Sequence, residues 1–109
     1  MKKQTFKNTI RNGSVRTIIF KEDDIWYGVA LEFNIVESGD NPKEVESSLN
    51  EAVVGYVENA VKNKLSDVVL NQKTDPEYEK LWREIVSSKK QLYPSIYSAN
   101  LLSLPALAF

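Results

Sequence analysis

Residues 25–33, Ile-Trp-Tyr-Gly-Val-Ala-Leu-Glu-Phe, alternate in side-chain character, and this period of two predicts a β-strand. Residues 15–21 are rich in β-branched and aromatic types and predict a strand before it. The intervening Glu22-Asp23-Asp24 interrupts the apolar pattern and predicts the turn of a hairpin. We expect the strongly apolar face of the second strand to lie against a helix, which would turn Trp26 toward solvent or a partner.

A third short strand and a helix are predicted next. Residues 35–37 favour the strand, and we interpret Gly39 as a turn position that needs unusual backbone angles. Asn41-Pro42-Lys43-Glu44 is typical of a helix start, with an N-cap, a proline at the first helical position and a capping-box carboxylate. Apolar residues at steps of three and four extend this helix to about residue 63. Within it, Gly55 is expected to allow close approach of another backbone.

The remaining third of the chain gives weaker signals. Residues 68–70 are a candidate for a short fourth strand, and Asp75-Pro76 predicts the start of a second helix that ends near residue 90. Residues 91–109 are apolar and carry no charged side chain, so we expect them to pack on the domain or on a second subunit.

The predicted fold class is therefore α+β, with an antiparallel or mixed sheet of three to four strands, one main packed helix and a second C-terminal helix. We divide the chain into a basic N-terminal arm (1–14), a βββα(β) domain (15–73), a C-terminal helix (74–90) and an apolar tail (91–109).

Composition narrows the possible chemistry. The 109 residues fit one domain. The chain has no cysteine and no histidine, which excludes disulfides, thiolate metal sites and every Ser-His or Cys-His catalytic pair. The start of the chain lacks the apolar core of a signal peptide, and no run of about 20 apolar residues occurs. We expect a cytoplasmic protein that crosses no membrane.

Charge is distributed unevenly although the net charge is only −1. Residues 1–16 carry five basic and no acidic side chains, whereas residues 17–79 carry five basic and fourteen acidic ones. An acidic middle segment suits a basic partner, although a normally solvated surface would give the same composition.

The order of strand, acidic turn, strand, short strand, Gly-Asp and capped helix over residues 18–61 resembles the HicB-like family, the antitoxin partners in HicA–HicB toxin–antitoxin pairs. Two segments carry the resemblance: the hairpin of residues 18–32 and the stretch Ile35-Val36-Glu37-Ser38-Gly39-Asp40-Asn41-Pro42-Lys43-Glu44. The resemblance implies a partial RNase H-like fold without nuclease activity, and a small basic ribonuclease toxin of the HicA type as partner.

This chain differs from the fuller family pattern after residue 64, where it shows no helix-turn-helix pair and no basic recognition helix. We therefore do not expect it to bind operator DNA. The leading hypothesis is a non-enzymatic, HicB-like antitoxin-type module that needs no cofactor or metal and covers the RNA-binding face of a toxin. The alternative is a solitary self-associating module, a dimer or tetramer with no toxin.

The predicted partner-binding residues are Glu22, Asp23, Asp24 and Trp26. For the three carboxylates the other interpretation is a solvated turn, and for Trp26 it is burial under the second helix or the tail. A two-metal nuclease site that would add Glu32 and Asp40 is a third hypothesis. Three adjacent carboxylates on a loop tip do not give the convergent geometry that such a site needs.

Overall fold

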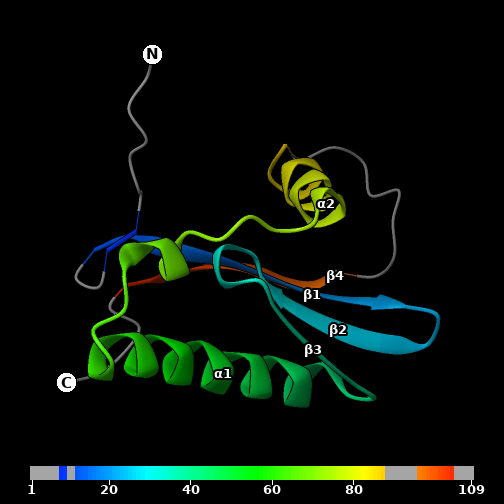
Figure 1. Cartoon of the computed structure of the whole chain (residues 1–109). Helices are drawn as coiled ribbons and strands as arrows, with labels where there is room; N and C mark the ends of the chain where they lie inside the picture. Colours follow the sequence, from blue (N-terminus) through cyan, green and yellow to red (C-terminus); the bar gives the residue numbers. More distant parts are fainter. Residues whose placement is uncertain (1–7, 10–11, 88–95, 105–109) are drawn as a thin grey trace.

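The computed structural model describes residues 8–9, 12–87 and 96–104 and confirms the α+β class. Strands β1 (Ser14–Glu22), β2 (Ile25–Ala30), β3 (Ile35–Gly39) and β4 (Ile96–Ser103) form one antiparallel sheet in the order β3-β2-β1-β4. The main helix, α1 (Pro42–Lys62), covers one face of the sheet, and the second helix, α2 (Pro76–Val86), lies on the other (Figure 1).

Both faces of the sheet are buried along β1. The adjacent residues Ile18 and Ile19 are 0% and 1% exposed, yet they point to opposite faces. Ile19 belongs to the α1-side cluster, whose buried members are Val15, Ile19, Ala30, Phe33, Val45, Leu49, Val53, Val57, Ala60, Leu70 and Leu104. Ile18 belongs to the α2-side cluster, whose buried members are Ile18, Phe20, Val29 and Leu31. The domain therefore has three layers, with a helix on each side of the sheet.

The apolar face of β2 faces α2, not the main helix. Val29 and Leu31 are buried in the α2-side cluster with Tyr27 packed against it, while Trp26 packs against the α1-side cluster. Trp26 was expected to lie on the face of the sheet away from the main helix, and this expectation is wrong. The sequence showed which residues of β2 share a face, but with two helices available it did not show which helix each face meets.

The second strand is shorter than predicted, because β2 ends at Ala30 and residues Leu31–Phe33 form the 3-10 helix η1. Asn34 closes the turn with a φ of 57°. The chain has to reverse here to pair β3 antiparallel to β2, so an extended conformation to residue 33 is excluded. The 3-10 turn places Leu31 in the α2-side cluster and Phe33 in the α1-side cluster, which a continuous strand would have put on one face.

The main helix starts as its sequence predicts. The Asn41 side chain accepts hydrogen bonds from the backbone N–H groups of Lys43 (2.8 Å) and Glu44 (3.2 Å), and Pro42 occupies the first helical turn. The helix then buries one stripe against the sheet, formed by Val45, Leu49, Val53, Val57 and Ala60.

The fourth strand comes from a different segment than expected. Residues Asp67–Leu70 form the 3-10 helix η2, capped by Ser66, and not a strand. Leu70 is fully buried and Val69 packs against the same core, whereas Val68 is 52% exposed. The position beside β1 is occupied by β4, from the uncharged apolar tail.

Three glycines differ in how closely other atoms surround them. A Cβ on Gly28 would lie 2.9 Å from both Ile19 Cδ1 and Val45 Cγ1, so α1 packs closely over this position. Gly39 is not among the residues with positive φ; a Cβ there would lie 3.1 Å from Val45 Cγ2, so the interpretation of unusual backbone angles is wrong. Gly55 has no atom within 4 Å of its Cβ position, so no backbone approaches it and that prediction is wrong as well.

Alanine at two of these glycines should change the free energy of unfolding in opposite directions. Gly28→Ala should lower it by about 1–3 kcal/mol, because Ile19 and Val45 have to move. Gly55→Ala should raise it by about 0.5–1 kcal/mol, because an exposed helical position gains helix propensity without a clash. Urea denaturation followed by circular dichroism measures both, and two shifts of the same sign would contradict this packing.

Candidate functional site

Helix α2 is held over the sheet by a cap and an apolar stripe. The Asp75 side chain accepts a hydrogen bond from the backbone N–H of Glu77 at 2.9 Å, and Pro76 follows it. Tyr78, Leu81, Trp82 and Ile85 pack against the α2-side cluster at helical spacing. None of the eleven residues of α2 is fully buried, so the helix covers its face of the sheet only partly.

Arg16 on β1 fixes the position of this helix. Its Nη1 and Nη2 atoms each donate to a carboxylate oxygen of Glu79 at 2.8 Å, and its Nε donates to Glu32 at 2.6 Å. Its guanidinium carbon also lies 5.8 Å from the ring centre of Trp82. The pKa of Arg16 is raised, chiefly because its guanidinium donates hydrogen bonds to Glu79. Burial acts in the opposite direction and is outweighed. Arg16 thus binds two carboxylates at once, that of Glu32 in η1 and that of Glu79 in α2.

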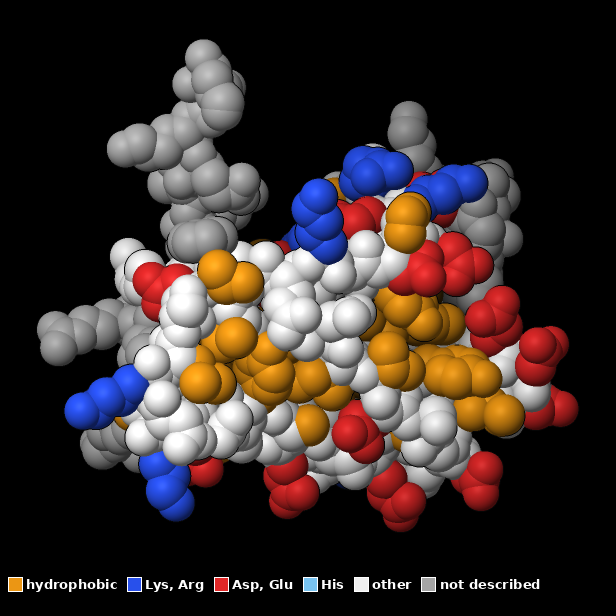
Figure 2. Space-filling view, viewed as in Figure 1, with side chains coloured by type: hydrophobic (Ala, Val, Ile, Leu, Met, Phe, Trp, Pro, Cys, Tyr) orange, Lys and Arg blue, Asp and Glu red, His pale blue; other side chains and the backbone are white. Residues whose placement is uncertain are grey.

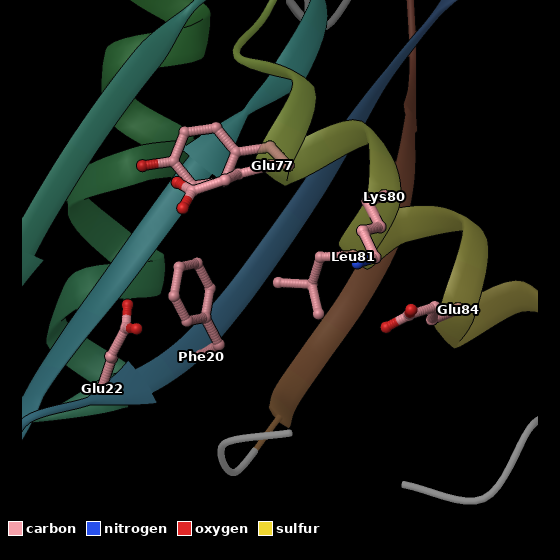
Figure 3. A pocket seen from close by; sticks show the side chains of 7 residues that line it. Phe20, Glu22, Glu77, Lys80, Leu81 and Glu84 are labelled. Carbon is pink, nitrogen blue, oxygen red and sulfur yellow. The ribbon is translucent and has the colours of Figure 1, made fainter. Parts of the chain in front are cut away.

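A pocket of about 230 Å³ opens between α2 and the hairpin end of β1. Figure 3 shows the side chains of Phe20 and Leu81 reaching into it from β1 and α2. Phe20 also stacks on Tyr27, with ring centres 5.7 Å apart, and lies 6.2 Å from the ring of Tyr78. The pocket therefore has an aromatic and aliphatic floor, and charged side chains stand around it: Glu22, Glu77, Lys80 and Glu84.

The rim of the pocket is acidic, with three carboxylates against one ammonium group. The pKa of Tyr78 is raised above its ordinary value near 10, first because burial disfavours the phenolate and then because of the negative charges of Glu77, Asp75 and Glu22. In Figure 2, acidic side chains border exposed apolar surface at the hairpin end of the molecule. The site thus combines an apolar floor with negative charge at its edge.

The hairpin tip continues this acidic rim. Asp23 and Asp24 have φ values of 53° and 66°, as the two-residue turn of a tight hairpin requires. The Asp24 side chain is 98% exposed, and its Oδ1 lies 3.8 Å from Lys21 Nζ. An ion pair this long and this exposed contributes little stability, so the carboxylate stays accessible to a partner.

The structure divides the predicted partner-binding residues between two faces. Glu22 lines the pocket, and Asp23 and Asp24 form the adjoining tip. Trp26 lies on the α1 side of the sheet, where its ring meets that of Tyr97 edge-on at 6.1 Å and Lys21 Nζ lies 5.8 Å from its centre. Trp26 and Glu22 therefore lie on opposite faces of the sheet.

Sequence reasoning missed the contribution of α2 to this site. The sequence predicts a second helix from Asp75-Pro76, but its pattern does not single out Glu77 or Glu84 as candidate binding residues. The available signal is the acidic first turn of α2, with Glu77 and Glu79, but acidic side chains are common at helix starts for local reasons. Only the way α2 lies on the sheet shows that these charges face the hairpin.

Two further features bear on what the site can do. Within residues 8–9, 12–87 and 96–104, no group of three or more carboxylates is close enough together to hold a metal ion, so the residues proposed for a two-metal site do not converge there. No helix in the same ranges combines the length and the apolar character needed to span a membrane.

Comparison with known proteins gives no match, whether to a family model, to a curated protein or to a solved structure. What the chain does is therefore inferred from the pocket and the hairpin.

Ionisation of Tyr78 provides a direct measure of the charge at this site. Because the pKa of Tyr78 is raised in the folded protein, the folded state favours the neutral phenol over the phenolate more than the unfolded chain does. The resulting contribution to the free energy of unfolding is fully present below pH 10 and is lost as the pH rises through the pKa of the folded state. Tyr78→Phe should remove an absorbance step above pH 10 in a spectrophotometric titration. Glu77→Gln should move that step to lower pH, and an unchanged step would mean that the rim charge does not reach the pocket.

Proposed function

We propose that this chain is a protein-binding module of the HicB-like antitoxin type, which neutralises a small basic ribonuclease toxin by covering its RNA-binding face. It acts in the cytoplasm as a binding protein, without a cofactor or a catalytic group of its own. The single observation that carries the proposal is the apolar pocket with an acidic rim between α2 and the hairpin. The α+β architecture, with one main helix on the sheet, agrees with the fold that the resemblance implies.

The pocket suits a lysine or arginine side chain. Such a side chain has an apolar stem that would pack on Phe20 and Leu81, and a cationic head that would reach Glu22 or Glu77. Burial of the stem supplies affinity, and the carboxylates supply selectivity for a basic partner. An RNA-binding surface is rich in these side chains because it contacts phosphates.

The hairpin tip extends the contact beyond the pocket. Asp23 and Asp24 form the turn between β1 and β2, which lies at one end of the molecule in Figure 1, so an approaching basic surface meets them early. Exposed charges of this kind increase the association rate more than they increase the strength of the final complex. In this proposal Glu22 and Glu77 hold the partner, Asp23 and Asp24 steer it, and Trp26 lies outside the contact.

Charge reversal at the rim should weaken partner binding. The double variant Glu22→Lys, Glu77→Lys would place two positive charges against a basic partner, and we expect at least a tenfold loss of affinity, about 1.4 kcal/mol. The measurement is co-expression with the protein encoded beside this chain, followed by copurification and a growth test of toxicity. Binding by the wild type should also weaken as salt is raised.

A matched control is available on the other side of the sheet. Glu51→Lys, Glu58→Lys makes the same change in net charge on the exposed face of α1 and should leave binding and neutralisation intact. Equal losses in both double variants would show that only net charge matters and would reject the pocket as the site. A neighbouring protein that is not basic, or that this chain neither binds nor neutralises, would reject the antitoxin function.

A second candidate function, self-association without a toxin, is favoured by a separate observation. Strand β4 is an uncharged strand at the edge of the sheet, and such edges can pair with a second copy of the same chain.

A further inference from the structure

Strand β4 lacks two of the features that usually protect an edge strand, and the register shift in its pairing with β1, opposite Ile19 and Phe20, lies near the start of the strand. Its eight residues, Ile-Tyr-Ser-Ala-Asn-Leu-Leu-Ser, contain no charged side chain and no proline. Among the strands that the structure describes, β4 pairs with β1 alone. Edge strands in stable monomers usually carry charges or prolines, or are short, because an unprotected edge offers hydrogen-bonding groups to another chain.

The direction of the outer hydrogen-bonding groups follows from the pairing with β1. The backbone N–H of Leu104, just after β4, donates to the carbonyl of Gly13 at 2.9 Å, so it points toward β1. Antiparallel ladders alternate, and Leu102, Asn100 and Ser98 therefore point the same way. The N–H and C=O groups of Ala99, Leu101 and Ser103 point away from β1, along one continuous outer edge.

Apolar side chains accompany this edge. Leu101 is 59% exposed and Tyr97 is 45% exposed, whereas the equivalent position in a buried strand would be covered. Ala99, which pairs with Ile18 and so shares the α2 face of the sheet with Leu101, has a small side chain. A strand laid against β4 would therefore gain hydrogen bonds and would also bury the side chain of Leu101.

The opposite edge of the sheet is protected. Strand β3 has five residues, Ile35–Gly39, with Glu37 at its centre. If two copies of β3 paired about a two-fold axis through the middle of the strand, Glu37 would stand opposite Glu37, which is unfavourable. Strand β4 meets no such repulsion in any register, so of the two edges it is the one that suits a second copy.

We infer that two copies of this chain pair through the outer edges of β4, antiparallel and about a two-fold axis, to form one continuous eight-stranded sheet. This inference gives the self-association candidate its surface and does not depend on the acidic pocket. Residues that face one another in an antiparallel ladder have the same hydrogen-bonding direction. The symmetric registers that use most of β4 are therefore centred on Ala99, Asn100 or Leu101.

A lysine on the edge should separate the two copies. Leu101→Lys replaces an exposed side chain, so the monomer should keep its fold, but each copy would bring a positive charge to the proposed interface. Light scattering on a size-exclusion column should give a mass of two chains for the wild type and of one chain for this variant. Val36→Lys, at a 47% exposed position on β3, is the matched control and should keep the mass of two chains.

Single cysteines test the pairing directly, because the native chain contains none. Cysteine variants at positions 99, 100 and 101 bring two thiols together only when the cysteine lies at the two-fold axis, where Cα atoms about 4.5–5.5 Å apart allow a disulfide. One of the three should give a covalent dimer under mild oxidation and so reveal the register. Glu37→Cys, on the β3 edge, should stay monomeric on a non-reducing gel.

A wild type with the mass of one chain would overturn the inference. So would a dimer that survives Leu101→Lys, or the absence of a cross-link at all three positions. Circular dichroism checks that each variant is folded, and Ala99→Pro, which removes an outward N–H without a loss to the β1 ladder, should repeat the effect of Leu101→Lys. Failure here leaves the charge-reversal test of the pocket unaffected, because the two experiments use different variants.

Discussion

Burial of β1 on both faces is the constraint on which the rest of this structure depends. Ile18 and Ile19 are neighbours, both are excluded from water, and they point in opposite directions. A single helix can cover only one face of a sheet, so a second element has to cover the other. Helix α1 covers one face with a stripe of five buried residues. Helix α2 lies on the other face but has no buried residue, so it covers that face incompletely. The pocket is a consequence of this incomplete cover.

The position of α2 is set by charge as much as by apolar contact. Arg16 lies on β1 and binds Glu79 through both terminal nitrogens, which determines how the helix lies on the sheet. Glu77 precedes Glu79 by two residues and so falls on a different side of the helix, toward Phe20 and the hairpin, where it lines the pocket. One ion-paired carboxylate therefore anchors the helix, and a nearby one lines the candidate site.

The elements predicted best from the sequence are those whose reasons are local. The Asn41 cap, the proline after it and the helical spacing of apolar residues act within a few positions, and α1 ends at Lys62, close to the predicted residue 63. Residues 31–33 and 68–70 were predicted wrongly because apolar content alone does not distinguish a strand from a 3-10 turn that fills the core. Which helix meets which face of β2 depends on packing across the whole chain, and this choice determined where Trp26 lies. Glu22, Asp23 and Asp24 could be singled out from the sequence; the part of the pocket that α2 supplies could not.

The two proposed surfaces use different physical chemistry and do not compete for the same residues. The pocket lies on the α2 face of the sheet and selects by charge, whereas the β4 edge lies in the plane of the sheet and selects by backbone geometry without charge. A two-fold axis that joins two antiparallel edges stands perpendicular to the sheet, so both copies would present the α2 face on the same side. The two acidic pockets would then open in one direction, on one rigid platform. A partner with two basic segments, or two copies of a partner, would meet both pockets, and the second contact would form at a high effective concentration.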